Sequence, residues 1–236
     1  MTTEEGLPVT APMPDNAAPP EAMAQLDVSG GVLISTAPEA PDAVPEDLLV
    51  GHSFGEAALL LPSAATARRL LLETIRARHR AAGRPKRRRL LVCADDAGLP
   101  AEFTGDVDVE AVPEDAGAIR AAIGPQTAGL FIAPVRVSKR LRMPSGALLA
   151  ELREMADEYG LALIFDETEA GLGRTGMAFA HEWTGVTPDL MLVGEAAGLP
   201  VAVLVLTAKY TRALPHARPP VPVADRALAR DLLTAA

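Results

Sequence analysis

The sequence has one cysteine, few aromatic residues and no long apolar run. A single thiol, Cys93, excludes an internal disulfide and suits a reducing cytosol, so we expect a cytoplasmic protein. Cys93 lies inside the apolar run 90–94, which predicts a buried and inert thiol rather than a nucleophile. No apolar run approaches the ~20 residues that span a bilayer, and no cationic segment precedes an apolar stretch at the N-terminus. We therefore expect no signal sequence and no membrane partner.

The chain also lacks an excess of basic residues. Asp and Glu number 31 against 22 Lys and Arg, which gives a net charge of −9. Because phosphate binding is driven mainly by clustered Lys and Arg, we expect no nucleic-acid partner. The one basic run, residues 84–89, directly precedes an apolar strand pattern, and we interpret it as a solvated loop. Aromatic residues make up only 3%, which leaves few rings to stack on a cofactor.

Three segments of the chain differ in composition. Residues 1–45 are rich in Ala, Pro and acidic residues and are expected to be mostly disordered. Residues 46–208 alternate helix and strand patterns and are predicted to form one domain, for which 49% apolar residues supply an ample core. Residues 209–236 are expected to form a C-terminal tail with a short helix.

Helix and strand patterns alternate along the domain. Helices are predicted at 63–82, 114–123 and 145–160, with Ser63 and Ser145 as N-caps. Strands are predicted at 90–94, 107–112, 127–133, 161–165, 190–193 and 201–206, and a further short strand precedes Ser53. This alternation predicts a three-layer α/β/α fold with a mainly parallel sheet. Such sheets bind ligands beyond the carboxyl ends of their strands, and Asp166 and Glu167 follow one of those ends.

Several motifs follow one another in register from the helix at 145–160 onward. They read LREMADEYGLALIFDE at 152–167, GLGRTG at 171–176 and HEWTGVTPDLM at 181–191. In this order they resemble the class III aminotransferases, also called the ornithine and acetylornithine aminotransferase family, over about residues 127–206. The resemblance implies the large-domain fold of the fold-type I pyridoxal phosphate enzymes. It also implies that Asp166 holds the place of the aspartate that pairs with the pyridine nitrogen of that cofactor.

The resemblance fails at the residue that holds the cofactor. In the family a lysine follows the strand at 190–193 and binds pyridoxal phosphate, but here Glu195 stands in that place. A carboxylate cannot form a Schiff base, so we expect no cofactor and no transamination. Glu169 replaces the family's glutamine, and VSKRLR at 137–142 replaces its glycine-rich loop. The turn 62–65, in the place of the family's phosphate-binding turn, lacks its glycine but could still attract an anion through free N–H groups. The family's C-terminal small domain is also missing after residue 206, so the chain looks shortened.

The altered site suggests a function without a cofactor. Asp166, Glu169 and Glu195 should converge near the vacated cavity, and at least one of the three should have a raised pKa unless a cation sits among them. The hypothesis is a biosynthetic enzyme that uses these carboxylates as general acids and bases on a small-molecule substrate such as a cationic amine. Glu167 and Arg174 are predicted to bind the substrate, although an ion pair that orders the loop is an equal alternative for Arg174.

Other interpretations remain open. A divalent metal on the same acids is less favoured, because no histidine lies at helical ligand spacing. A non-catalytic scaffold or regulatory partner of another enzyme is a full alternative to an enzyme. The family's members are dimers, so we expect a homodimer or a hetero-oligomer under either reading. His181 and Trp183 are expected to pack against the loop rather than act.

A separate motif points to different chemistry. GHSFGE at 51–56 resembles the nucleophile turn of acyl-carrier acyltransferases, in which the serine sits on a sharp turn from a strand to a helix. That chemistry needs a distant histidine as base, and none of His79, His181 and His216 suits the role. A structural or chance match is therefore favoured for Ser53.

Overall fold

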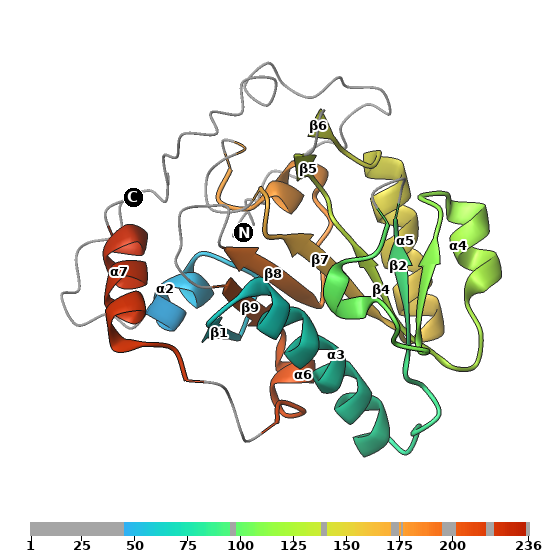
Figure 1. Cartoon of the computed structure of the whole chain (residues 1–236). Coiled ribbons are helices and arrows are strands. Elements are labelled where there is room, and N and C mark those ends of the chain that lie inside the picture. Colours follow the sequence, from blue (N-terminus) through green and yellow to red (C-terminus); the bar gives the residue numbers. More distant parts are fainter. Residues whose placement is uncertain are drawn as a thin grey trace, which may run out of the picture.

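A computed structural model describes residues 45–94, 98–137, 141–170, 175, 177–194, 202–215 and 220–234 (Figure 1). The described α-helices are α2 (Pro45–Gly51), α3 (Ala64–Ala81), α4 (Ala116–Ala122), α5 (Gly146–Tyr159), α6 (Ala208–Thr211) and α7 (Val223–Thr234). The strands are β1 (Ala57–Leu61), β2 (Arg89–Cys93), β3 (Val109–Val112), β4 (Thr127–Ile132), β5 (Arg136–Val137), β6 (Leu141–Arg142), β7 (Ala162–Glu167), β8 (Leu190–Gly194) and β9 (Ala202–Leu206). Two short 3₁₀ helices are η1 (Ala101–Phe103) and η2 (Ala180–Thr184).

The two longest helices begin and end at the residues that the sequence marks. The Ser63 hydroxyl accepts a hydrogen bond from the Thr66 N–H at 3.1 Å and caps α3. The Ser145 hydroxyl accepts from the Leu148 N–H at 3.1 Å and caps α5. Gly160 ends α5 in the left-handed conformation, with φ of 64°, which favours glycine because it has no Cβ. The predicted limits of these helices are therefore confirmed to within a residue or two.

The main sheet has seven strands in the order β1-β9-β8-β7-β4-β2-β3. Only β9 among them is antiparallel, to both β1 and β8. The predicted three-layer α/β/α fold with a mainly parallel sheet is confirmed. The connection from β8 to β9 is too short for the crossover of a dozen or more residues that a parallel pair needs, which explains the one reversed strand.

The sequence reading is wrong at the start of the domain. The stretch before Ser53 forms helix α2 and not a short strand, and β1, which was not predicted, comes after it. α2 has acidic residues, Glu46 and Asp47, in its first turn, where they interact favourably with the helix dipole. β1 is a run of apolar residues that is buried at four of its five positions, so tertiary burial against β9 fixes it.

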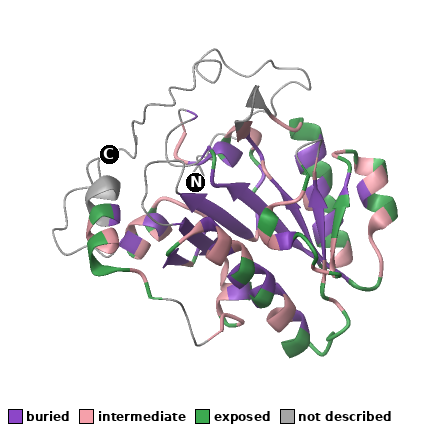
Figure 2. Ribbon diagram, viewed as in Figure 1, coloured by how far each residue is buried: buried purple, intermediate pink, exposed green. Residues whose placement is uncertain are grey.

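Helices cover both faces of the sheet. On one face, α3, η1 and α6 bury Leu71, Phe103 and Tyr210 against the strands. On the other face, α4 and α5 bury Ile119 and Leu149 in a second core. The central strands are buried throughout (Figure 2), as parallel strands covered on both faces should be.

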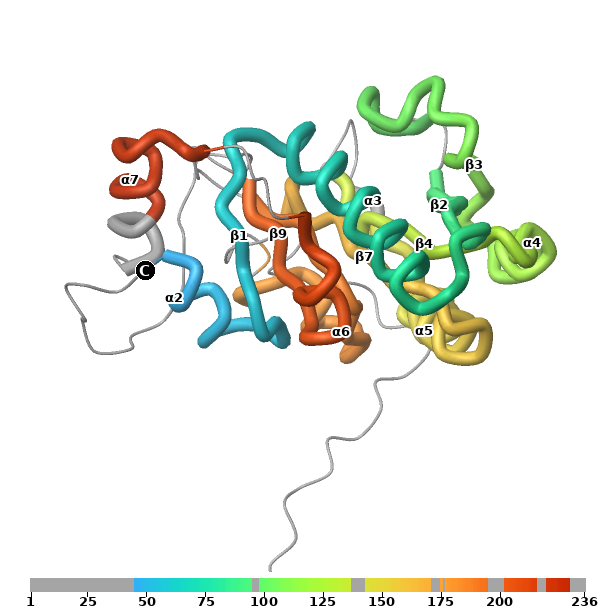
Figure 3. The backbone as a smooth tube through the Cα atoms, turned by 90° about the horizontal axis from the view of Figure 1, so that it is seen from below, coloured from blue at the N-terminus to red at the C-terminus, as the bar shows by residue number. Residues whose placement is uncertain are grey.

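The two ends of the sheet carry different elements. α7 lies beside α2 at one end, and β3 and α4 lie at the other (Figure 3). Arg226 of α7 forms an ion pair with Glu46 of α2 at 2.7 Å, and Ala229 is fully buried. The predicted tail thus contains a helix that packs on the domain, while the boundary at 208/209 stays a prediction. Residues 1–44 lie outside the described part of the chain.

No helix in the described ranges is long and apolar enough to cross a membrane.

Candidate functional site

A cavity of about 240 Å³ lies at the carboxyl edge of the sheet, and we call it the carboxyl-edge cavity. Its walls come from the ends of β4 and β7, from α3 and from the loop before η1. The charged side chains on its wall are Arg68, Arg136, Asp166 and Glu169. This is the edge where open α/β sheets bind ligands. The cavity therefore brings together two of the three carboxylates that the sequence predicts as catalytic.

Asp166 is held by hydrogen bonds on both carboxylate oxygens. Oδ2 accepts from Arg68 Nε at 3.0 Å and from Arg68 Nη2 at 2.9 Å. Oδ1 accepts from the Thr168 N–H at 3.1 Å and from the Thr168 hydroxyl at 2.7 Å. The side chain is only 7% exposed. The orientation of the Asp166 carboxylate is therefore fixed, because Arg68 binds one oxygen and Thr168 binds the other.

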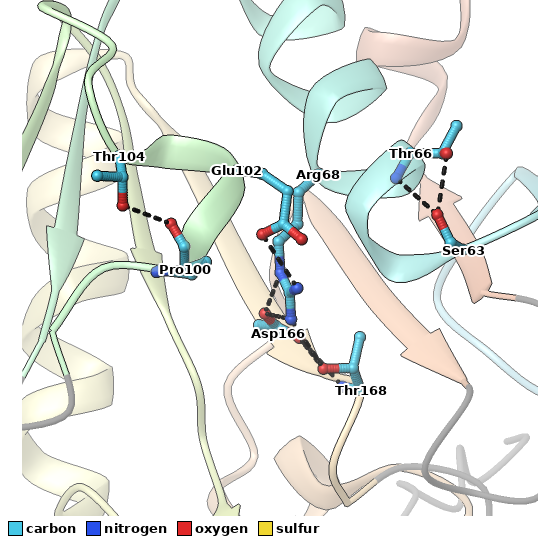
Figure 4. A network of polar contacts seen from close by, with 8 residues as sticks. All are labelled: Ser63, Thr66, Arg68, Pro100, Glu102, Thr104, Asp166 and Thr168. Atoms are coloured by element: carbon cyan, nitrogen blue, oxygen red, sulfur yellow. Dashed lines mark hydrogen bonds and ion pairs between the residues drawn. The ribbon is translucent and has the colours of Figure 1, made fainter.

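Arg68 lies between two carboxylates (Figure 4). Its guanidinium contacts Asp166 on one side and, through Nη1 at 3.4 Å, Glu102 of η1 on the other. Burial lowers the pKa of Arg68, but the nearby charges of Asp166 and Glu102 outweigh this effect, so its pKa is raised above the ordinary value. A cation therefore sits among the predicted acids, which is the condition that the sequence analysis left open.

Glu167 lies on the opposite face of the sheet from Asp166, because successive strand residues point to opposite faces. Its carboxylate accepts hydrogen bonds from the backbone N–H groups of Ala180 at 2.6 Å and His181 at 2.8 Å. The His181 imidazole Nδ1 lies 2.8 Å from Oε1 of the same carboxylate. Glu167 is fully buried and does not line the carboxyl-edge cavity. Its contacts fix the start of η2, and its predicted role in substrate binding stays untested.

Trp183 contacts the loop at 171–176 as predicted, whereas His181 packs against aromatic rings outside that loop; that neither residue acts stays a prediction. The His181 ring contacts Phe54, Phe165 and Phe179 at centroid distances of 5.7, 6.1 and 5.9 Å. The Trp183 indole donates to the Thr175 carbonyl at 3.1 Å. Both side chains hold the segment after β7 in place.

Two predicted site residues lie outside the described residues. β8 ends at Gly194, and Glu195 is the next residue in the sequence. Arg174 also falls in an undescribed stretch. Their predicted roles stay predictions. Within the described ranges, no three His, Cys, Asp or Glu side chains group as a metal site would require.

Sequence reasoning missed three of the residues that define the site: Arg68, Thr168 and Glu102. The signal for Arg68 was present, because it lies four residues after Ala64 and three before Leu71, both buried on the sheet-facing side of α3. An arginine on such a stripe needs an acidic partner. No local pattern identifies Asp166, 98 residues further along the chain, as this partner.

The lysines do not approach Asp166 in the described structure. Lys209 follows β9, and its Nζ lies 3.6 Å from Asp189 Oδ1, at the amino end of β8. Lys86 precedes β2 and is exposed, also at the amino edge. The third lysine of the sequence, Lys139, lies outside the described residues. The Leu163 N–H donates to Asp189, so Leu163 marks the level of Asp189 on β7. Asp166 lies three residues further along the same strand, which is about 10 Å away.

The nucleophile-turn reading of GHSFGE does not match the structure. Ser53 lies in a turn from helix α2 to strand β1, which is the reverse of the strand-to-helix turn that such a serine requires. Its hydroxyl accepts a hydrogen bond from the Gly55 N–H at 3.1 Å. A Cβ built on Gly55 would come within 2.2 Å of Val205 Cγ1, so the glycine permits close packing against β9. The motif is structural here.

A larger hollow, of about 370 Å³, lies at the amino edge between α3 and α6. Its charged lining residues are Arg78, Lys209 and Arg212. The hollow has the greater volume, but its lining has no carboxylate to act as a base beside these cations. The smaller carboxyl-edge cavity is therefore the candidate functional site.

Comparison with known proteins gives the family. Residues 97–218 match the class-III aminotransferase family, a match that begins well before the stretch from which the resemblance was first drawn. This chain belongs to the class III aminotransferases. The acetylornithine aminotransferase 1 of Bradyrhizobium diazoefficiens is 35% identical over 178 residues, which cover 68% of this chain and 44% of the relative. The acetylornithine aminotransferase of Rhodobacter capsulatus is 31% identical over 179 residues, 68% of this chain and 46% of the relative. The chain thus spans less than half the length of these curated relatives.

Solved structures share the fold. The N-acetylornithine aminotransferase of Stenotrophomonas maltophilia has a TM-score of 0.69 at 24% identity, over 92% of this chain and 58% of that one. The ornithine aminotransferase of Toxoplasma gondii has a TM-score of 0.71 at 19% identity, over 91% of this chain and 57% of that one. The predicted likeness to the large domain of fold-type I enzymes is confirmed.

The described residues do not fit the pyridoxal phosphate that the family implies. Arg68 occupies the carboxylate oxygen of Asp166 on the cavity side, and no described lysine lies at this edge. In the turn at residues 62–65, which stands in place of the family's phosphate turn, Ser63 already accepts the Thr66 N–H. The anion attraction predicted for this turn therefore loses one donor. We derive no chemistry through this cofactor.

Proposed function

We propose that this aminotransferase-fold protein does not transaminate, and that it acts without pyridoxal phosphate on a small molecule in the carboxyl-edge cavity. One observation carries the proposal: both described lysines lie at the amino edge of the sheet, away from Asp166. The sequence has Glu195 where the family's lysine would follow β8. Among the described residues no lysine lies at the carboxyl edge, so none of them is placed to form a Schiff base with the cofactor.

The chemistry that remains is proton transfer by carboxylates. Glu169 lines the cavity, and Glu195 comes directly after β8 in the sequence, so these two are the proposed acid and base. Asp166 has all its hydrogen bonds within the protein, through Arg68 and Thr168, and we assign it a positioning role in place of the catalytic role first predicted. Because Arg68 supplies the cation, the substrate does not need to be a cationic amine.

The decisive experiment tests for a covalent cofactor adduct. The full chain is incubated with pyridoxal phosphate, reduced with borohydride and mapped by mass spectrometry. We expect no adduct above the level on the exposed, loop-borne Lys86, which serves as the internal baseline for non-specific labelling. A stoichiometric adduct on Lys209 or Lys139 would restore the aminotransferase reading.

Substitutions test the acid–base step. Glu169→Gln and Glu195→Gln keep the side-chain size and remove proton transfer, and we expect each to lower turnover by ~10²–10⁴. Glu151→Gln, on the exposed face of α5, is the matched control and should leave turnover unchanged. A substrate for the assay is sought first among small carboxylic acids and amines that raise the melting temperature of the protein. Unchanged turnover in both site variants, with the fold intact, would contradict the carboxylate mechanism.

A non-catalytic partner role is the second candidate, and the closed ion pairing of Asp166 favours it. Arg68 and Thr168 satisfy both oxygens without any ligand, so the site is stable as it stands. In that role the protein would form a complex with a second copy of itself or with an intact aminotransferase. Sedimentation at micromolar concentration, alone and with such an enzyme, measures association. Activity that appears only after the enzyme is added would favour the partner role.

A further inference from the structure

We infer that the guanidinium of Arg68 takes the place of the cofactor's pyridine nitrogen on Asp166, and that Arg68 thereby makes the site reject even free pyridoxal phosphate. The inference rests on the proposed function, and it adds a residue that determines specificity. The proposed function excludes a covalent cofactor, because no described lysine lies at this edge, but it does not explain why the free cofactor would not bind. Rejection of the free cofactor requires a separate cause, and Arg68 provides one.

The hydrogen bonds of Asp166 leave no acceptor for a ring nitrogen. Oδ2 already receives two N–H groups from Arg68, at 3.0 and 2.9 Å, and Oδ1 receives two donors from Thr168. The family resemblance implies that a protonated ring nitrogen bonds this aspartate. Arg68 presents the same kind of group, a charged planar N–H donor, from within the chain.

Displacing Arg68 from Asp166 is costly. Its side chain is 16% exposed, and the two carboxylates that flank it, Glu102 and Asp166, are 14% and 7% exposed. A ring nitrogen on Asp166 would separate the guanidinium from one of these carboxylates in a poorly solvated place. Removing a partner from a buried pair leaves an uncompensated charge, which is strongly unfavourable.

The position of Arg68 is set by the fold and not by a ligand. α3 begins at Ala64, after its Ser63 cap, so Arg68 falls one turn into the helix on the side that faces the sheet. Nη2 also donates to the Thr168 hydroxyl at 3.2 Å, which ties the guanidinium to the turn after β7 (Figure 4). The position beside Asp166 is therefore occupied by a side chain of the protein itself.

The test uses pyridoxamine phosphate as the probe, because it has the cofactor's ring and phosphate but no aldehyde to label lysines. Binding to the full chain is measured by calorimetry and by the probe's fluorescence. We expect no binding to the wild type at millimolar probe and at least tenfold tighter binding to Arg68→Ala. Arg76→Ala is the matched control. Arg76 lies on the same helix, but its guanidinium pairs with Asp106, so this variant should bind the probe no better than the wild type does.

Added guanidinium ions should then compete with the probe on Arg68→Ala, because they refill the place beside Asp166. Arg68→Gln, which keeps the side-chain stem and one donor, is the second variant if Arg68→Ala does not fold, and its affinity should also rise. Wild-type binding at micromolar probe, or no gain in a folded Arg68 variant, overturns the inference. Neither result touches the proposed function, which instead fails if a borohydride-fixed adduct forms on the wild type.

Discussion

Two aspartates lie at opposite edges of the sheet, Asp166 at the end of β7 and Asp189 before β8, and both pair with arginine. Of the two cavities described above, Asp166 lines one and Asp189 lines neither. Asp189, at the amino end, accepts the Leu163 N–H at 2.9 Å and pairs with Arg153 at 3.2 Å and Lys209 at 3.6 Å. Its contacts tie two strands together. Asp166, at the carboxyl end, contacts side chains and its own turn, and faces the carboxyl-edge cavity. The same ion pairing is therefore structural at one edge and, in our proposal, determines ligand choice at the other.

The largest expected effect is on stability, and it separates the two pairs. Arg68→Ala leaves Asp166 buried without its cation, and we expect a loss of about 3 kcal/mol in the free energy of unfolding. Arg153→Ala leaves Asp189 with Lys209 and the Leu163 N–H, so a loss of about 1 kcal/mol is expected. Urea denaturation of both variants measures the difference. Equal losses would show that the two pairs do the same structural work.

A smaller effect is the dependence of stability on pH, which we assign to the amino edge. His79, at the end of α3, is buried, and Nε2 lies 3.1 Å from the Ala128 carbonyl oxygen. Burial lowers the pKa of His79; the Ala128 hydrogen bond opposes this, and the nearby cations Arg78, Arg84 and Arg87 add to it. The unfolded chain then binds a proton that the folded chain does not. The contribution of His79 to the free energy of unfolding is fully present above a pH of about 6.5 and is lost as the pH drops below it.

The variant that checks this is His79→Gln, which can still donate to Ala128 but cannot gain a charge. Urea denaturation between pH 5 and pH 8 should show a shallower fall for His79→Gln than for the wild type. If the stabilities of His79→Gln and the wild type fall equally with pH, the titrating group is not His79, and the pH dependence cannot be assigned to the amino edge.

The smallest effect is expected at Cys93, the last residue of β2. Burial raises the pKa of its thiol to about 12, with a further contribution from the charge of Glu114. We expect no reaction of the native protein with a thiol reagent at pH 8, and full reaction in urea. Rapid labelling of the native chain would mean that the carboxyl edge opens far more than its packing implies.

Local chemistry made much of the fold predictable. The hydroxyls of Ser63 and Ser145, and the left-handed Gly160, set helix limits through contacts within a few residues. The uninterrupted apolar run before Asp166 identified a strand buried on both faces. The alternation of side chains along a strand also predicts that Asp166 and Glu167 face opposite sides of the sheet, so the two do not belong to one site. α2 and β1 were missed because their order depends on packing against distant elements.

The sequence by itself determined that Asp166 lies near the end of a buried strand and that residues 195–201, between β8 and β9, contain no lysine, since both depend only on residue type and local pattern. Only the tertiary structure decided what Asp166 contacts. Arg68 lies 98 residues away in the chain, and it reaches Asp166 because α3 crosses the sheet with its first turns over the carboxyl edge. Likewise, Lys209 and Asp166 could have met on sequence distance alone, but reversal of β9 carries Lys209 to the amino edge. Which charged residues pair depends on which surfaces the packed layers bring together, and the local sequence pattern does not contain that information.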